Sequence, residues 1–551
     1  MIHFPHSRAP RALVARMLPR LALALIACAL VVSSRARAQE IAAGDSTAAR
    51  ASAARTRGSI SVRVLDDANQ PVPNATVYVF RQTQNSRPAY DNSAARSGKY
   101  VVSNLDPGVY RVSVSAPGYV QETDPLSPTG EPTFYRPGDS LTMRLAKGGV
   151  ITGRVTDADG NPLVGARVTA MRVRDLSGRT AQDTGMGNFS ARERRTDDRG
   201  IYRLYGLLSG SYVVLAGGKS QFSVIRPTAY DADAPTYYPA ATRDGAVEVQ
   251  VQTGQELTDI DIRHRGERGH TISGTLAGAL PAVGTRGSMF VLLMNPTTGA
   301  NENQVFIQPD ANQSFSFDSV GDGDYDIVAN GYAANENATF APPLRVSVRG
   351  ADVVGLRLLL APLGSLAGHL VFEPLKTTDA AKPECQRESA LYPQETLVFT
   401  RREGSDLPQQ RSAFASAETA PDAKGDFVLR NLRDGRQRFG VRLTDEHLYV
   451  RAATLPTGSA ATARTAAAST TIDLARVGFS LKPGEQLTGA TVNVASGAAA
   501  LHGRVTAAEG EQLPEGLRVY LIPAERERAE DVLRYGETAA QADGTFAFKN
   551  L

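Results

Sequence analysis

A short phrase recurs five times along this chain, at intervals the length of a small domain. Each copy has an aromatic residue followed five positions later by Leu or Val, usually with Gly two positions before the aromatic. The copies are Gly98–Tyr100–Leu105, Gly200–Tyr202–Leu207, Gln313–Phe315–Val320, Gly425–Phe427–Leu432 and Gly544–Phe546–Leu551. Roughly 100 to 120 residues separate successive copies, which exceeds a solenoid unit of roughly 20–50 residues and suits one domain per copy. We call this phrase the signature.

The clearest copy is the second, in which short segments alternate apolar and polar residues. Between Ile151 and Asp157, the residues Ile151, Gly153 and Val155 fall on one face, as in a half-buried β-strand. Turn-forming residues follow, and further strands are expected at Val164–Ala170, Gly200–Leu204, Ser211–Ala216 and Gly254–Ile262. The other copies keep this order, and no segment has a sustained helical period. The pattern predicts an antiparallel sandwich of about seven strands in each copy.

Two stretches carry a resemblance to a known family. They are Gly153–Val168, which reads GRVTDADGNPLVGARV, and Gly425–Leu432, which reads GDFVLRNL. Both resemble the carboxypeptidase regulatory-like domain, a prealbumin-like β-sandwich. The resemblance implies the fold for nearly all of the chain after its leader. It implies little about function, because such accessory modules are attached to many different proteins.

The fold predicted is therefore all-β, a tandem array of antiparallel seven-stranded prealbumin-like (Ig-like) β-sandwich domains. We expect a signal peptide at 1–38, a flexible linker at 39–57, sandwiches at 58–148, 149–266, 267–363 and 364–497, and an incomplete fifth at 498–551. The Ala/Thr-rich stretch Ala452–Thr471 is interpreted as a long loop in the fourth sandwich. The fifth copy stops at Leu551, before its turn and return strand, so we expect a longer natural protein or a last unit that is disordered or swapped.

The first 38 residues have the features of a secretory signal. A basic segment precedes the apolar run Leu21–Val32, and Ala36-Arg37-Ala38 predicts cleavage between Ala38 and Gln39. The true start is either Met1 or, as we favour, Met17. A lipoprotein anchored through Cys28 is the less favoured alternative, since the apolar run continues past that residue. The apolar run is also short for a membrane span, and none is expected in the mature chain.

Composition narrows the classes of function. The formal net charge of +3 includes six arginines and no acid within residues 1–38, so the mature chain stands near −3. Without a basic face, nucleic acid is not an expected partner. Cys28 and Cys385 are the only cysteines. A secreted chain with one remaining thiol fits a bacterial envelope or extracellular setting better than a disulfide scaffold.

Two groups of residues have the composition of metal ligands. His264, Glu267 and His270 could hold zinc, but they straddle the seam between two expected domains with glycines between them, and we interpret them as a solvated linker. The runs Asp157–Asn161 and Asp322–Asp326 could hold calcium, but both coincide with turns that the repeat requires and neither has the distal Glu of an EF-hand. Whether any loop binds calcium stays open at this stage. No cofactor or structural metal is predicted.

No catalytic constellation stands out in the sequence. There is no Gly-x-Ser-x-Gly phrase on a strand–helix elbow, and Cys385 has no evident base near it in sequence. A non-enzymatic protein is therefore expected.

Paired aromatic residues are the strongest candidates for ligand contact. Phe134 and Tyr135, and likewise Tyr237 and Tyr238, stand before the closing strands of the first two sandwiches. Neighbours on one strand point to opposite faces, so at most one of each pair can belong to a core. Local packing is one interpretation, and a weak glycan or partner contact is the other.

We thus expect a secreted or periplasmic protein of the cell envelope that acts as a structural or binding scaffold for an unknown protein or glycan. One alternative is an array of carbohydrate-binding modules. The other is the accessory N-terminal part of a larger outer-membrane receptor or secreted enzyme. The oligomeric state is not predicted.

Overall fold

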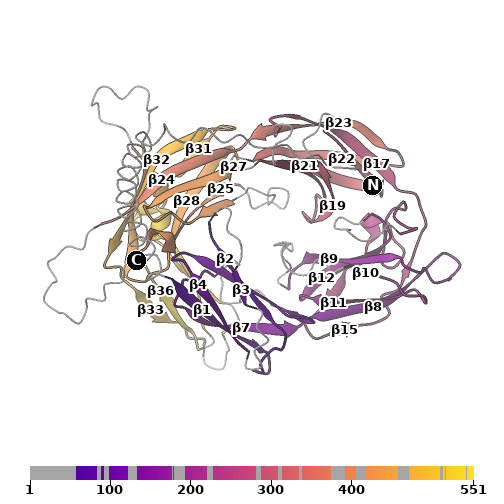
Figure 1. The fold of residues 1–551 in the computed structure, drawn as a ribbon, viewed down its shortest axis with the longest axis horizontal. Coiled ribbons are helices and arrows are strands. Elements are labelled where there is room, and N and C mark those ends of the chain that lie inside the picture. The colour runs from indigo at the N-terminus through magenta and orange to yellow at the C-terminus, as the bar shows by residue number, and fades with distance from the viewer. Residues whose placement is uncertain are drawn as a thin grey trace, which may run out of the picture. The chain divides into compact units, whose positions relative to one another are not determined.

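The computed structural model of the chain is shown in Figure 1. It describes residues 57–83, 89–91, 98–121, 133–176, 178, 193–219, 228–280, 287–307, 313–333, 338–373, 391–404, 416–456, 471–508, 513–514, 517–541 and 543–551. Nearly all described residues lie in the compact unit Ser59–Leu551. Almost every element within them is a β-strand, so the all-β prediction is confirmed.

The first sandwich comprises β1–β7, arranged as two sheets in the orders β4-β1-β7-β6 and β3-β2-β5. The strands are β1 (Gly58–Asp66), β2 (Thr76–Arg81), β3 (Ala89–Asp91), β4 (Lys99–Leu105), β5 (Tyr110–Ser115), β6 (Tyr119–Val120) and β7 (Ser140–Lys147).

The second sandwich comprises β8–β16. One sheet contains β11-β8-β15 with β16 also paired to β8, and the other contains β10-β9-β12-β13 with β14 also paired to β12. The elements are β8 (Gly149–Thr156), β9 (Arg167–Arg174), β10 (Glu193–Arg195), β11 (Ile201–Leu207), β12 (Gly210–Ala216), β13 (Thr236–Tyr237), the 3-10 turn η2 (Arg243–Gly245), β14 (Val249–Val251), β15 (Glu256–Leu257) and β16 (Ile262–Arg263).

In the third sandwich, pairing between β22 and β23 joins the two layers into one seven-stranded sheet in the order β19-β18-β21-β22-β23-β17-β20. Its strands are β17 (His270–Gly278), β18 (Gly287–Met294), β19 (Asn301–Ile307), β20 (Ser314–Val320), β21 (Gly323–Ala333), β22 (Thr339–Val348) and β23 (Val353–Pro362).

The fourth sandwich has sheets in the orders β27-β24-β32-β29-β30 and β26-β25-β28-β31. Its elements are β24 (Gly364–Phe372), η5 (Pro393–Glu395), β25 (Thr396–Arg402), β26 (Ser416–Thr419), β27 (Asp426–Leu432), β28 (Gly435–Leu443), β29 (Leu448–Pro456), β30 (Thr471–Asp473), α2 (Leu474–Val477), β31 (Phe479–Leu481) and β32 (Gln486–Ser496). The start of the loop predicted at Ala452–Thr471 is thus wrong, because β29 continues to Pro456 with Ala453 and Leu455 buried in the core.

The described part of the fifth unit forms two two-stranded sheets, β33-β36 and β34-β35. The elements are β33 (Leu501–Arg504), β34 (Arg518–Leu521), η7 (Arg526–Arg528), η8 (Val532–Arg534), β35 (Gly536–Ala539) and β36 (Thr545–Phe548).

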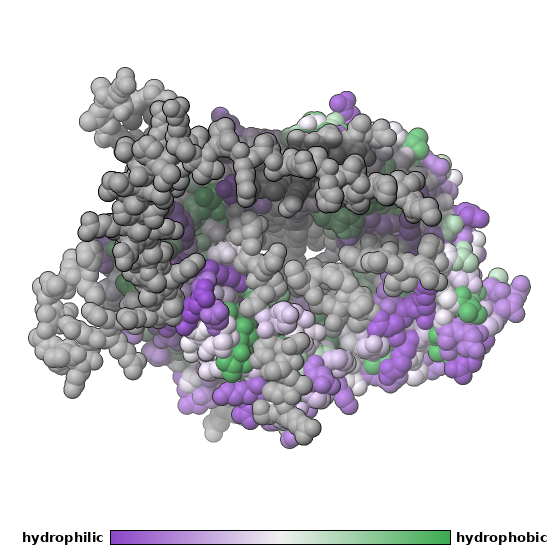
Figure 2. All heavy atoms as spheres, viewed as in Figure 1, coloured by the Kyte–Doolittle hydropathy of each residue, from purple (hydrophilic) through white to green (hydrophobic). Residues whose placement is uncertain are grey.

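Each of the first four sandwiches has its own apolar core. The buried side chains of each of the four main clusters come from a single sandwich. Because a unit of about 100 residues can close a core without disulfides, this agrees with a chain that has so few cysteines. On the face shown in Figure 2, hydrophobic residues are interspersed among hydrophilic ones. The exact boundaries expected between the sandwiches stay predictions.

The opening and closing strands of each complete sandwich pair in parallel, which differs from the wholly antiparallel arrangement expected. The pairs are β1 with β7, β8 with β15 and β16, β17 with β23, and β24 with β32. The other described strand pairs of the second, third and fourth sandwiches are antiparallel, as expected. Since parallel neighbours run in the same direction, the chain enters each sandwich at one end and leaves it at the other.

The signature holds the opening strand in place. Its glycine has positive φ in Gly98, Gly200, Gly425 and Gly544, and a Cβ there would lie within 2.7 Å of an opening-strand carbonyl oxygen. The glycine carbonyl in turn accepts a hydrogen bond from an opening-strand amide, as in Val155 N–H to Gly200 O at 2.8 Å. In four copies the signature aromatic lies opposite an opening-strand glycine, and these pairs are Tyr202–Gly153, Phe315–Gly274, Phe427–Gly368 and Phe546–Gly503. At Gly368 and Gly503 a Cβ would meet the ring of Phe427 or Phe546, at 2.5 and 2.3 Å, whereas at Gly153 and Gly274 it would first meet the backbone of Ile260 or Leu356.

Two glycine substitutions in the second sandwich separate backbone strain from steric collision. Gly160→Ala meets open space at φ +87 and costs only the strain of a left-handed residue, about 1 kcal/mol. Gly200→Ala adds a collision with Val155 O at 2.6 Å and should cost about 3 kcal/mol. Hydrogen–deuterium exchange of β8 and β11 in the full chain should therefore accelerate strongly only in Gly200→Ala. Equal exchange in the two variants would contradict this role of the signature glycine.

Candidate functional site

The turn after each signature is closed by a side chain that reaches back to its start. Tyr110, Tyr212 and Tyr325 each donate a hydroxyl hydrogen bond to the backbone carbonyl four residues earlier, at 2.7 to 2.8 Å. In the fourth sandwich Gln437 takes this position, and its Nε2 donates to Arg433 O at 2.8 Å. The buried amide thus makes the bond that the tyrosine hydroxyl makes elsewhere, which explains the one departure from the aromatic pattern.

An arginine guanidinium lies over the glycine of the same turn. In the first, second and fourth sandwiches it comes from the end of the second strand of that sandwich, as Arg81, Arg172 or Arg402. Each donates to the carbonyl of the residue before the turn glycine, namely Pro107, Ser209 or Asp434. Because Arg81, Arg172 and Arg402 lie opposite Tyr110, Tyr212 and Gln437 in the sheet, the arginine and the reaching side chain hold the turn from two directions.

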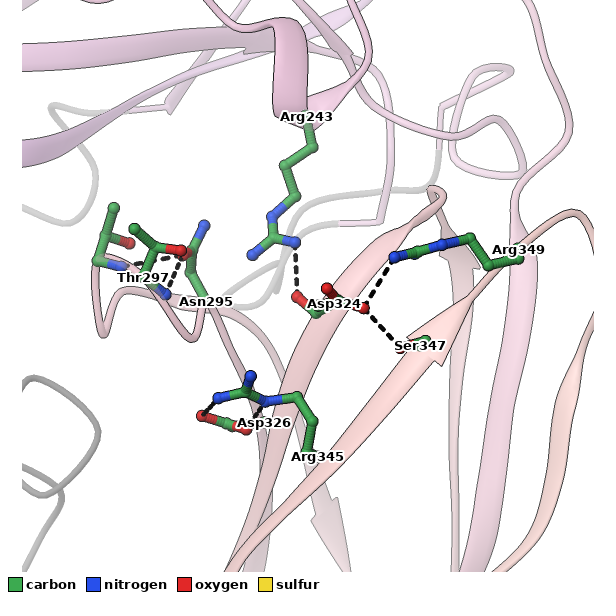
Figure 3. A network of polar contacts seen from close by, with 9 residues as sticks. Arg243, Asn295, Thr297, Asp324, Asp326, Arg345, Ser347 and Arg349 are labelled. Carbon is green, nitrogen blue, oxygen red and sulfur yellow. Dashed lines mark hydrogen bonds and ion pairs between the residues drawn. The ribbon is translucent and has the colours of Figure 1, made fainter.

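In the third sandwich this arginine comes from the preceding sandwich. Met294, the last residue of β18, pairs with Asp326, so Asn295 comes opposite Tyr325 where the others have arginine. The guanidinium over Gly323 belongs to Arg243 of η2, and its Nη1 donates at 2.6 Å to Asp324 O, the carbonyl after the turn glycine, where the other arginines bond the carbonyl before it. The same group lies 4.5 Å from the centre of the Tyr325 ring. The third sandwich is therefore completed by a residue of the second (Figure 3).

A buried ion pair fixes Arg243 at this junction. Its Nε lies 2.7 Å from Glu302 Oε1, and the two side chains are 8% and 10% exposed. Asn295 Nδ2 donates to the same carboxylate oxygen at 2.8 Å. Burial would lower the pKa of Arg243, but the charges around it, Glu302 first, raise it on balance. Burial raises the pKa of Glu302 although Arg243 opposes the change.

Tyr237, one of the aromatic residues singled out in the sequence, belongs to this cluster. It is 7% exposed, and burial raises its pKa far above the usual value, so its hydroxyl stays protonated. Tyr238 is half-buried against the second core. In the first sandwich, Tyr135 packs against the core, and Phe134 lies under the guanidinium groups of Arg111 and Arg442 at 5.9 and 5.6 Å. Ligand contact through these four residues stays a prediction, which the burial of Tyr237 does not favour.

The acidic run beside the junction is occupied by protein partners. Asp324 accepts from Ser347 Oγ and Arg349, and Asp326 forms a two-oxygen ion pair with Arg345 (Figure 3). Asp322 accepts from Gly350 N–H at 2.7 Å. The other candidate run is a turn, in which Asp157 Oδ1 accepts from the amides of Asp159 and Asn161. Among the described residues, no group of three or more His, Cys, Asp or Glu is placed to hold a metal ion.

The candidate zinc ligands are dispersed along the segment between β16 and β17. His264 is 5% exposed, with Nδ1 3.1 Å from Thr236 Oγ1 and Nε2 3.2 Å from Asp233 Oδ2. Glu267 pairs with Arg265 instead. His270 lies near Asp322 and Asp352, at 3.5 and 3.8 Å. His264 therefore ties this connection to the second sandwich.

The other junctions between complete sandwiches are also short and packed. Gly148 alone separates β7 from β8, and a Cβ on it would lie 2.4 Å from the Cα of Gly206. Leu363 alone separates β23 from β24, and it packs with Val328, Ala338 and Phe340 in a small cluster of its own. The Arg433 guanidinium of the fourth sandwich lies 4.3 Å from the Phe340 ring of the third.

Several residues singled out in the sequence lie outside the described residues, namely Met1, Met17, Cys28, Ala38, Gln39 and Cys385. Across the part of the chain that the structure describes, no helix has the length and apolar character needed to cross a membrane.

Comparison with known proteins gives a family match for the first sandwich. Residues 59–133 match the carboxypeptidase regulatory-like domain. For the first sandwich, this confirms the family that was predicted from stretches of the second and fourth copies. No curated protein matches the chain.

Solved structures that the chain resembles are bacterial proteins, at low similarity. The minor pilin GBS52 of Streptococcus agalactiae is 14% identical, with 38% of this chain and 96% of that chain covered and a TM-score of 0.20. The major pilin subunit BcpA of Bacillus cereus is 10% identical, with 55% and 99% covered and a TM-score of 0.15. The Bacillus anthracis TIE protein is 13% identical with a TM-score of 0.14, and the chain spans about half of it, with 55% of this chain and 51% of that chain covered. TM-scores this low do not support transfer of a pilin's role to this chain.

Substitution of Arg243 tests whether the third sandwich depends on the second. Arg243→Ala leaves Glu302 buried without its partner, which should cost about 3–5 kcal/mol. Hydrogen–deuterium exchange should therefore accelerate in β19 and at the start of β21, as well as around η2. The matched control is Arg172→Ala, whose effect should stay within the second sandwich. An Arg243→Ala effect confined to residues 236–250 would contradict the account.

Proposed function

We propose that this protein is an exported, non-enzymatic scaffold of the cell envelope, in which successive β-sandwiches hold exposed loops at fixed spacings. The observation that carries this proposal is the completion of the third sandwich by Arg243 of the second. A flexible string of modules does not need a buried ion pair at a junction, because the backbone carbonyls of each turn find their hydrogen-bond donors within the same module. A scaffold of fixed geometry does need such a contact.

The strand order supports the same function. Parallel pairing of opening and closing strands sends the chain onward from one end of a sandwich to the other. One-residue connections at Gly148 and Leu363 leave little freedom between neighbours. A short connection with a packed junction resists the relative domain motion that is otherwise expected within a chain.

The described polar clusters support a structural role over a catalytic one. His264 is a candidate for proton transfer by its residue type. It is buried, however, and its two ring nitrogens lie within hydrogen-bond distance of Thr236 and Asp233. Thr236 is 1% exposed and its hydroxyl also accepts from Arg265 N–H, so it is not presented to a substrate. Export is proposed from the signal sequence alone, with a glycan or protein as partner and no nucleic acid.

Distance measurement across the second and third sandwiches tests the proposal. Spin labels at Val164→Cys and Leu359→Cys occupy exposed sites, 55% and 63% in the native residues, and Cys385→Ser removes the remaining thiol of the mature chain. Double electron–electron resonance should give one narrow distance distribution, because the junction is fixed. The same labels with Arg243→Ala should give a broad one.

A distribution that is equally broad with and without Arg243 would reject the fixed scaffold. A hydrolase activity of the purified protein that one point substitution abolishes would reject the non-enzymatic part of the proposal.

A further inference from the structure

The third sandwich carries an exposed group of aromatic side chains on the outer face of its sheet. Met289 and Val291 of β18 are fully buried in the core, so Phe290 between them points to the opposite face. Phe306 of β19 lies directly opposite Phe290, and the two ring centres are 4.7 Å apart. Tyr332 of β21 meets Phe290 edge-on at 5.7 Å. We call these three residues the aromatic platform.

The platform is accessible although it lies on regular strands. Phe306 is 57% exposed and Tyr332 is 37% exposed, while Phe290 is half-buried beneath them. Neither exposed ring contributes to the main core of the sandwich. Folding gains little from rings at such exposure, because apolar side chains stabilise the fold through the area they remove from water, and a contiguous exposed apolar patch can mark a binding site.

The segments of the strands around the platform carry no charge, although the same strands hold Glu302, Asp324, Asp326 and Arg345 elsewhere along their length. The segments 287–294, 303–307, 327–333 and 339–344 of β18, β19, β21 and β22 contain no Asp, Glu, Lys or Arg, although charged residues make up 21% of the chain. Amide side chains lie among them instead, including Gln304 on the same face of β19 as Phe306. An uncharged surface of rings and amides matches a ligand that is uncharged, has apolar faces and has hydroxyl groups.

The size of the platform argues against a protein partner of the usual kind. A stable protein–protein interface needs about 800 Å² from each partner. Three aromatic side chains present at most about 150–250 Å² each when fully exposed. At the exposures observed here they offer far less than an interface requires, but enough to stack against a few sugar rings.

An exposed aromatic pair recurs on the same face of the corresponding strands in the first sandwich. Tyr78 of β2 lies opposite Tyr90 of β3, with ring centres 6.4 Å apart, and Tyr90 is 61% exposed. In the second and fourth sandwiches the third strand has a glutamate at this position instead. Glu193 lies opposite Thr169, and Glu418 lies opposite Phe399. The aromatic pairs are thus a property of two sandwiches and not a requirement of the fold.

We propose that the aromatic platform of the third sandwich binds an uncharged polysaccharide, with Phe306 and Tyr332 as the stacking residues. This site differs from the aromatic residues considered in the sequence. The proposal adds a ligand to the scaffold. It can be tested independently of the scaffold function, since the rings take no part in the Arg243 junction.

Affinity electrophoresis of the mature chain tests the proposal. The probes are hydroxyethylcellulose and amylopectin as uncharged polysaccharides, with alginate as the anionic comparison. At least one uncharged polymer should retard the protein, and Phe306→Ala and Tyr332→Ala should each weaken retardation about tenfold, equivalent to about 1.4 kcal/mol. Val354→Ala and Leu359→Ala are the matched controls, because these β23 residues are 68% and 63% exposed in the same sandwich. Both controls should leave retardation unchanged.

Three results would overturn the proposal. The first is no retardation by either uncharged polymer. The second is retardation that Phe306→Ala and Tyr332→Ala leave unchanged. The third is concentration-dependent self-association in sedimentation velocity that these two variants abolish, which would make the platform a contact between copies of this chain. The distance measurement on the Arg243 junction would be unaffected by any of them.

Discussion

The constraint on which the rest of the structure depends is the tight turn that follows each signature. The turn exposes backbone carbonyls beside a glycine, and a buried carbonyl without a partner is costly. Three sandwiches meet this constraint internally, with an arginine from the second strand and a tyrosine or glutamine that reaches back across the turn. In the third sandwich, Asn295 is too short to do so and instead organises the β18–β19 turn and Glu302. Arg243 covers this turn from outside, although it donates to the carbonyl that follows the turn glycine and not to the one before it. A local requirement of one fold thereby becomes a contact between two.

The use of Arg243 in place of an arginine from within the third sandwich links folding to function. A buried arginine–carboxylate pair contributes little net stability compared with apolar packing, but removing one partner is costly because a charge is left buried. Such a pair therefore specifies how two surfaces meet. Together with the one-residue connections at Gly148 and Leu363, it supports the proposal that the spacing of neighbouring sandwiches is part of the folded state. In the proposed scaffold, such a contact would hold the surface of the aromatic platform at a set position relative to the second sandwich, which would suit presentation of a binding site.

Much of the fold could be predicted from the sequence because its signals are local. Period-two alternation located the opening strands, and the recurring glycines marked positions where φ is positive and a Cβ would collide with the backbone. The parallel pairing of opening and closing strands could not be predicted from alternation, because either direction gives the same pattern. The junction was missed for a related reason: Arg243 is a single loop residue with no pattern around it. A signal did exist, since alignment of the copies puts Arg81, Arg172 and Arg402 where the third copy has Asn295. The aromatic platform was missed because its three residues come from separate strands and meet only in the sheet.

Restoring the missing arginine inside the third sandwich tests most directly whether Arg243 acts as a substitute for it. In a chain with Arg243→Ala and Asn295→Arg, the new guanidinium would start from the position that Arg81, Arg172 and Arg402 occupy. Hydrogen–deuterium exchange at Gly323–Asp326 would be compared with that of Arg243→Ala alone, and Asn295→Arg alone would control for the bonds that Asn295 makes to Thr297 and Thr298. The account predicts that the double variant regains protection at this turn while the link to the second sandwich stays lost. Protection that does not return, or that returns together with a fixed distance between the two sandwiches, would contradict it.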